Sequence, residues 1–166
     1  MFQSFFPQPK LFFSSLALWS GILILVWYSF GKTIGESLGF DLAETEPVIG
    51  LGHFITSEFL WFDTFFAFGA LAFFFVWRSR SPHEWQVWSV LGSALLIYLS
   101  YASVQVSVVI NAWYGPFYND IQTALTGDGG ITASDFYGHF LVFCTIEFPY
   151  ILFIFLNRFF TAHYIF

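Results

Sequence analysis

The chain contains four long apolar runs, and these runs limit its fold more than any other feature. Crossing the hydrocarbon core of a bilayer takes roughly 20 predominantly apolar residues. The runs cover Leu11–Phe30, Phe59–Trp77, Val87–Ala112 and Phe140–Asn157. Only two charged residues fall inside them, Asp63 in the second run and Glu147 in the fourth. We therefore predict four transmembrane helices over these ranges.

The composition favours helices in lipid over a soluble globular core. The chain is 57% hydrophobic, 25% aromatic and only 10% charged, whereas a soluble domain is about one quarter charged. A core built from 166 residues could not bury 26 Phe, 7 Trp and 8 Tyr behind a wettable surface. The runs also lack the alternation of barrel strands, and an open sheet in lipid would leave backbone groups unpaired. These observations predict an all-α membrane protein, with residues 1–166 forming one transmembrane domain.

The few basic residues predict the orientation in the membrane. Arg78 and Arg80 lie between the second and third runs, Lys10 precedes the first and Arg158 follows the fourth. The two longer connections, about 31–58 and 113–139, carry eight acids and a single Lys. Those acids are Glu36, Asp41, Glu44, Glu46, Glu58, Asp120, Asp128 and Asp135. Because basic residues concentrate on the cytoplasmic side, we expect both termini in the cytoplasm and the protein in an inner membrane.

The third run carries polar residues on two nearly opposite stripes. One stripe contains Ser89, Ser93, Ser100, Ser103, Ser107 and Asn111, and the other contains Tyr98, Tyr101 and Gln105. Small hydroxyl residues allow close contact between helices, so this run is expected to be a central packing helix. The alternative is that the stripe of Tyr98, Tyr101 and Gln105 lines a cavity.

Glu147 and Asp63 are the candidates for proton coupling. An acid within a bilayer is costly unless it faces a partner or a water-filled cavity, and apolar surroundings favour its neutral form. Pro149, two residues after Glu147, removes a backbone donor and is a candidate hinge. The alternative for Glu147 is a neutral acid that hydrogen-bonds a neighbouring helix. Asp63 lies only about 6 Å into its helix, where water can reach it.

Several other chemistries are not supported by the sequence. "FGKT" at 30–33 lacks the first glycine of a phosphate loop, because position 26 is Val, and "HEWQV" at 83–87 lacks the second His of a zinc-protease helix. Cys144 is the only cysteine and is expected to be a small buried residue. No basic patch suggests nucleic acid. We expect no metal, no cofactor, no ATP binding and no enzymatic activity.

Four stretches resemble the SbmA/BacA family of bacterial inner-membrane peptide transporters. They are "MFQSFFPQP" at the start, "SPHEWQVWSVLGSALL", "NAWYGPFYNDIQTAL" at 111–125, and "FFTAHYIF" at the end. The resemblance implies a homodimer whose fold is similar to the membrane half of an ABC exporter without its nucleotide-binding domain. It also implies proton-driven import of antimicrobial peptides and of microcin- and bleomycin-type compounds. Since family members are longer, the chain resembles their N-terminal portion.

The chain departs from the family at two positions. The resemblance implies a glutamate where this chain has Gln105, and it implies no acid at the position of Glu147. Glutamine can hydrogen-bond but cannot carry a proton. The proton-coupling role of Glu147 therefore comes from membrane physics and not from the resemblance.

The segment 111–125 has two interpretations. Its aromatic and polar residues are Asn111, Trp113, Tyr114, Phe117, Tyr118, Asp120 and Gln122. They are typical of an aromatic belt at the outer interface, with Gly115-Pro116 expected to break the helix. Alternatively, they line an outer vestibule whose acids raise the local concentration of cationic peptides. "TGDGGITASDF" predicts a turn, with Ser134 and Asp135 as candidate caps of the next helix.

Two other functions remain open at this point. The chain could be the membrane domain of an ABC-type lipid or fatty-acyl transporter. The membrane domains of fatty-acyl ABC transporters contain a sequence that resembles the first part of the 111–125 segment. It could also be a structural membrane partner that transports nothing.

Overall fold

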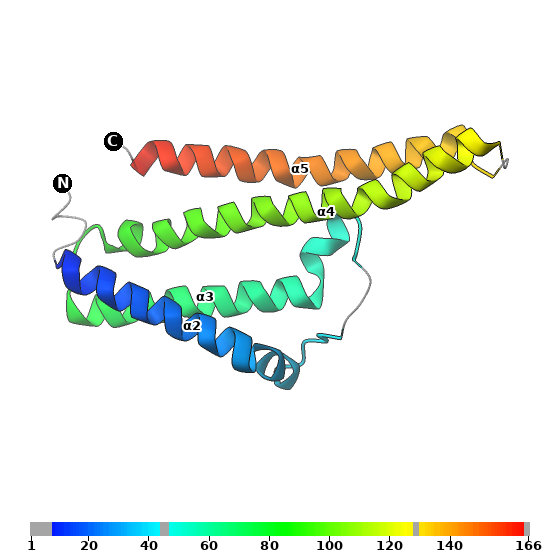
Figure 1. Cartoon of the computed structure of the whole chain (residues 1–166). Helices are drawn as coiled ribbons and strands as arrows, with labels where there is room; N and C mark the ends of the chain where they lie inside the picture. The colour runs from blue at the N-terminus through cyan, green and yellow to red at the C-terminus, as the bar shows by residue number, and fades with distance from the viewer. Residues whose placement is uncertain (1–7, 44–46, 128–129, 165–166) are drawn as a thin grey trace. The chain divides into compact units, whose positions relative to one another are not determined.

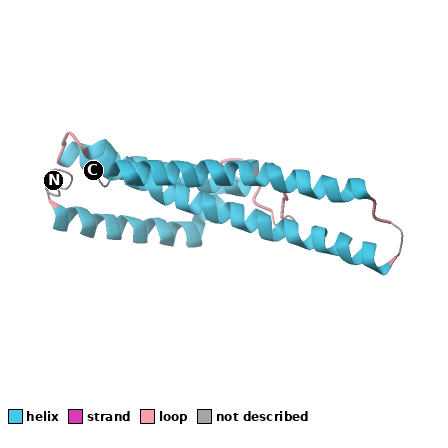
Figure 2. Ribbon diagram, turned by 90° about the horizontal axis from the view of Figure 1, so that it is seen from above, coloured by secondary structure: helices cyan, strands magenta, loops and turns pink. Residues whose placement is uncertain are grey.

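The computed structural model describes residues 8–43, 47–127 and 130–164, and within them every regular element is a helix (Figure 2). Four of these helices are long and apolar enough to cross a membrane, which confirms the predicted all-α membrane fold. The chain divides into two compact units, one made of residues 1–44 and 57–95, the other of 45–56 and 96–166. Glu44, Glu46 and Asp128 lie outside the described residues.

The first unit is built on α2 (Pro9–Ser37) and α3 (Ser57–Arg80), which run antiparallel (Figure 1). Proline at the start of α2 fits the first helical turn, where a backbone N–H has no intrahelical partner. The end of α2 is set by Gly39, whose φ of 94° suits glycine. The N–H groups of Gly39 and Phe40 donate to the carbonyls of Glu36 and Gly35, each at 3.0 Å, closing the helix end.

Indole N–H groups join the helices of this unit. Trp19 Nε1 of α2 donates to the carbonyl of Gly69 at 3.0 Å, and Trp61 Nε1 of α3 donates to the carbonyl of Gly31 at 3.0 Å. A buried cluster of Phe12, Phe73, Phe74, Trp77 and Val90 fills the space at one end. Because an unpaired N–H in apolar surroundings is costly, these bonds fix the two helices against each other.

The third predicted helix starts at Val87 as expected, but its first turn and its end differ from the prediction. Residues Val87–Gly92 form a π-helix, η2, and α4 follows over Ser93–Thr126. The predicted end at Ala112 is wrong, since α4 continues for another 14 residues. At 34 residues α4 is about 51 Å long, well beyond the roughly 30 Å of a hydrocarbon core.

The second unit pairs α4 with α5 (Ala133–Tyr164) in an antiparallel hairpin (Figure 1) and includes the short η1 (Leu51–Ile55). The predicted outer loop at 113–139 is wrong, because only residues 127–132 connect the two helices. Val106, Val109, Trp113 and Ile146 form the buried cluster of this unit, and Phe54 of η1 packs against it. Packing between α4 and α5, rather than membrane thickness, sets the helix lengths.

The start of α5 confirms one predicted cap and corrects the other. The Asp135 carboxylate accepts both the backbone N–H and the hydroxyl of Thr132 at 2.7 Å, so Asp135 takes part in the cap as predicted. The residue preceding the helix is Thr132, and Ser134 lies inside the first turn.

Cys144 is exposed on α5, contrary to the prediction that it is buried. It lies two positions from the fully buried Ile146, which turns it toward the opposite side of the helix. A thiol on a lipid-facing helix surface behaves as a small apolar group.

Replacing Gly35 with Ala should destabilise the first unit. The added Cβ would lie 2.6 Å from Leu42 Cδ1 and 2.9 Å from Trp61 Nε1, and the indole is fixed by its hydrogen bond. We expect a loss of about 1–3 kcal/mol, seen as a lower midpoint of thermal unfolding in detergent. Gly21→Ala is the control on the same helix, because its Cβ meets nothing within 4 Å. Equal midpoints for both variants would contradict the close approach at Gly35.

Candidate functional site

The buried face of α4 explains how its two polar stripes are arranged. The buried residues are Leu99, Ala102, Val106, Val109 and Trp113, which recur every three or four positions. On a helical wheel this stripe lies between the serine stripe and the stripe of Tyr98, Tyr101 and Gln105. Ile97, Val104 and Val108 lie on the remaining side and are 62%, 59% and 47% exposed. The polar stripes therefore border the packing face, and the side available to lipid is aliphatic.

Most serines of α4 are satisfied within their own helix. Ser93, Ser100 and Ser103 each donate to the carbonyl four residues earlier, at 2.8–2.9 Å. Asn157 Nδ2 of α5 also donates a hydrogen bond to Ser100 Oγ at 3.2 Å, which joins the two helices. The serine hydroxyls are thus used mainly within the helix and contribute little polar lining.

The stripe of Tyr98, Tyr101 and Gln105 is half-buried and meets an element from the connection before α3. Gln105 Oε1 lies 3.1 Å from Nε2 of His53, which belongs to η1, and the rings of Tyr98 and Tyr101 are 6.4 Å apart. The stripe therefore presents an amide, an imidazole and two phenols along one side of the second unit. Its role as a cavity wall stays a prediction, to which the structure adds His53.

The 111–125 segment packs against the start of α5 through Trp113, Phe117 and Asp120. Trp113 Nε1 donates to the carbonyl of His139 at 3.0 Å, and Asp120 Oδ2 lies 2.7 Å from His139 Nε2. The rings of Trp113 and Phe117 stack with centroids 4.6 Å apart, and Phe143 lies 5.0 Å from Trp113. This arrangement combines an aromatic cluster with an imidazole–carboxylate pair.

The predicted helix break at Gly115-Pro116 is wrong, because α4 runs through Pro116. Proline costs an interior helix one hydrogen bond and some strain. Trp113 and Phe117 flank Pro116 on the same face, and both pack onto α5. Their packing outweighs the local cost of the proline.

The other polar and aromatic residues of the segment are on the exposed side of α4. They are Asn111, Tyr114, Tyr118 and Gln122. The rings of Tyr114 and Tyr118 stack at 5.7 Å, one turn apart. The segment thus has a buried half that joins two helices and an exposed half that is free to meet other molecules. Only the exposed half suits the predicted vestibule.

Glu147 lies half-buried on α5, next to the fully buried Ile146. In the part of the chain that the structure describes, no hydrogen bond or ion pair involves its carboxyl group. Pro149 is buried, and α5 continues through it without interruption. Asp63 belongs to the other unit, where it lies on α3 with its Oδ1 atom buried.

Two histidines of the site, His53 and His139, were not singled out from the sequence. The pairing of His139 with Asp120 has a simple spacing. Asp120 lies six residues before the end of α4 at Thr126, and His139 lies six residues after the start of α5 at Ala133. Residues equally far from a tight connection face each other in an antiparallel hairpin. That signal depends on knowing that the connection is short. No comparable sequence signal places His53 beside Gln105.

Replacing Trp113 with Ala should destabilise the α4–α5 hairpin more than replacing the adjacent Tyr114 with Ala. Trp113 is 7% exposed and holds both a stacking partner and a hydrogen bond, whereas Tyr114 is 41% exposed. We expect Trp113→Ala to cost up to about 3–5 kcal/mol, the range for aromatic residues in water-soluble cores. Thermal unfolding of the purified protein measures the loss, with Tyr114→Ala as the control. A comparable loss in the control would show that burial at Trp113 does not hold the hairpin.

A comparison with known protein families finds a match over this region of the chain. The model of the SbmA/BacA-like family matches residues 82–166, which are 85 of the 166 residues and include η2, α4 and α5. The match covers the Trp113–Asp120 segment, His139 and Glu147, and it agrees with the resemblance predicted from the sequence. With four helices able to cross a membrane, the protein is a multi-pass membrane protein. The chain belongs to the SbmA/BacA-like family, a family of peptide transporters.

Proposed function

We propose that the protein imports peptides across the bacterial inner membrane at the expense of the proton gradient. The observation that carries this proposal is the family match over α4 and α5, the pair of helices that contains Glu147. The proposed substrates are antimicrobial peptides and microcin- and bleomycin-type compounds. Both termini are proposed to lie in the cytoplasm, since Lys10, Arg78, Arg80 and Arg158 flank one side of the spans.

Glu147 is proposed to be the group that binds and releases the proton. It lies near the middle of α5, and no described residue offers it a counter-charge. An acid in the middle of a membrane-spanning helix is costly unless it faces a partner or a water-filled cavity, so its position favours a functional role. Pro149 lies two residues further along α5, and the backbone hydrogen bond that it cannot make lowers the cost of bending there. A bend there would move Glu147 between apolar and hydrated surroundings, which couples its proton to helix motion.

The outer end of the α4–α5 hairpin is proposed to receive the peptide. The exposed Tyr114 and Tyr118 offer apolar faces with polar tips, which suit proline-rich and aromatic segments. The exposed acid Asp135 lies on the same hairpin and attracts basic peptides.

A second copy of the chain is proposed to complete the transport path. Helix α5 exposes a series of large apolar residues, among them Phe148 at 72% and Phe155 at 61%. Such a surface suits lipid or a second copy, and a path for peptides needs more walls than one hairpin supplies.

The central test is uptake of a fluorescent proline-rich peptide by cells that lack their own importer. The cells would express the intact gene that encodes this chain, with and without a protonophore. We expect uptake that falls to background when the proton gradient collapses. Absence of uptake, with the protein verified in the membrane, would reject import and favour an ABC-type lipid transporter or a structural partner.

Glu147→Gln tests the coupling residue. Because glutamine keeps the shape but cannot bind a proton, we expect uptake near the level seen with protonophore, at unchanged amounts of protein in the membrane. Glu84→Gln is the matched control, since Glu84 is exposed and lies between α3 and η2. Unchanged proton-coupled uptake in Glu147→Gln would remove Glu147 from the mechanism.

Gln105→Glu in the Glu147→Gln background tests whether the coupling acid can change helix. The new carboxylate would lie about where Gln105 Oε1 now meets His53, at 3.1 Å. If both positions face the same hydrated path, coupled uptake should return in part. If uptake stays at background while Gln105→Glu alone is active, the two positions are not interchangeable.

A further inference from the structure

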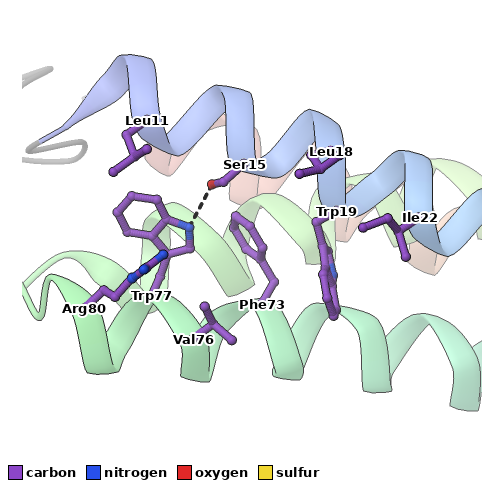
Figure 3. A pocket seen from close by; sticks show the side chains of 9 residues that line it. All are labelled: Leu11, Ser15, Leu18, Trp19, Ile22, Phe73, Val76, Trp77 and Arg80. Atoms are coloured by element: carbon purple, nitrogen blue, oxygen red, sulfur yellow. Dashed lines mark hydrogen bonds between the residues drawn. The ribbon is translucent and has the colours of Figure 1, made fainter.

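An apolar groove runs between α2 and α3 of the first unit (Figure 3). Its walls come from a stripe of α2, from Leu11 to Ile22, and from a stripe of α3, from Phe73 to Arg80. The residues that line it are Leu11, Ser15, Leu18, Trp19, Ile22, Phe73, Val76, Trp77 and Arg80. Eleven residues of helix separate Leu11 from Ile22, so the groove extends for about 17 Å along the helix axis.

The polar groups within the walls are already satisfied. Trp77 Nε1 donates to Ser15 Oγ at 3.1 Å, and Ser15 Oγ donates to the carbonyl of Phe12 at 2.8 Å. Trp19 Nε1 donates to the carbonyl of Gly69 at 3.0 Å. The walls therefore offer carbon surface to an occupant and require no polar atom from it.

Arg80 is the exception, and it lies at one end of the groove (Figure 3). Over the residues that the structure covers, no hydrogen bond or ion pair engages its guanidinium group. The ring centroids of Phe12 and Trp77 are 5.2 Å apart, which brings the start of α2 beside the end of α3. Lys10 and Arg78 therefore lie at the same end of the unit as Arg80, and all three are exposed. This end has an excess of positive charge.

We propose that the groove binds one acyl chain of an anionic phospholipid, with the lipid phosphate against Arg80. A planar guanidinium group binds phosphate through two parallel hydrogen bonds, which the apolar walls of the groove cannot offer. The positive end of an otherwise apolar groove complements a negatively charged headgroup attached to a hydrocarbon chain. The site lies in the leaflet at the Arg80 end. Its residues belong to the first unit, whereas those of the proposed peptide path belong to the second.

The size of the groove suits a segment of hydrocarbon. Its volume is about 190 Å³, and an apolar cavity of about 150 Å³ is enough to bind benzene. A chain lying along the groove covers Leu18, which is 68% exposed, and Val76, which is 50% exposed. A lipid bound in this way adds contacts between α2 and α3 that the two helices cannot make by themselves.

The experiment is native mass spectrometry of the intact protein released from nanodiscs. The discs would contain phosphatidylglycerol and phosphatidylethanolamine in equal amounts, and lipids that stay bound to the protein would be counted. We expect phosphatidylglycerol to be retained in preference. Arg80→Gln should retain about fivefold less phosphatidylglycerol, the effect of one cation near an anionic lipid. Arg78→Gln should lose less, because Arg78 adds to the positive charge at this end but does not line the groove.

A second variant tests the hydrocarbon part of the site. Leu18→Trp adds bulk within the groove at an exposed position, and thermal unfolding in detergent verifies that the variant folds. We expect it to lose bound lipid of both kinds. Three outcomes would overturn the proposal: retention by Leu18→Trp equal to that of the unmodified protein, equal losses in Arg80→Gln and Arg78→Gln, or cross-linking that shows another protein segment in the groove. None of these measurements depends on peptide uptake.

Discussion

The structure depends on indole N–H groups that donate to backbone carbonyls of a neighbouring helix. Trp19 donates to Gly69, Trp61 to Gly31 and Trp113 to His139. In hydrocarbon, lipid is as apolar as a side chain, so helices gain little from hiding apolar surface. An N–H without a partner there costs roughly 2–7 kcal/mol. Separating the helices would leave each indole N–H in need of a new partner, a cost that an aliphatic contact does not carry.

Two of the accepting carbonyls belong to glycines, Gly69 and Gly31. A Cβ at Gly69 would lie 2.6 Å from Leu23 Cδ1, and one at Gly31 would lie 3.3 Å from the ring of Trp27. At Gly69 the missing side chain lets α2 approach α3 closely enough for Trp19 to reach the carbonyl. At Gly31 it leaves room for the ring of Trp27 on the same helix. The high content of tryptophan and the positions of glycine are therefore two parts of the same packing solution.

More of the fold than of the candidate site could be predicted from the sequence. Lipid forces backbone groups to pair within the chain, so four apolar runs were enough to predict four helices and their approximate positions. The ends of α4 and α5 could not be predicted, because Trp113 and Phe117 hold the pair together beyond the apolar runs and across Pro116. Gln105 was recognised as polar on a packing helix, but its partner His53 comes from a connection whose path no sequence pattern fixes.

Glu147 and Asp63 looked alike as acids within apolar runs, and the structure separates them. Asp63 lies in the second turn of α3, and it is outside the family match over residues 82–166. Glu147 lies inside that match, far from both ends of α5, and beside Ile146, which anchors the helix to α4. An acid near a helix end can reach interfacial water by a small side-chain motion, so its position does not require a function. An acid in the middle of a long helix has no such route, which is why Glu147, and not Asp63, is the residue proposed to carry the proton.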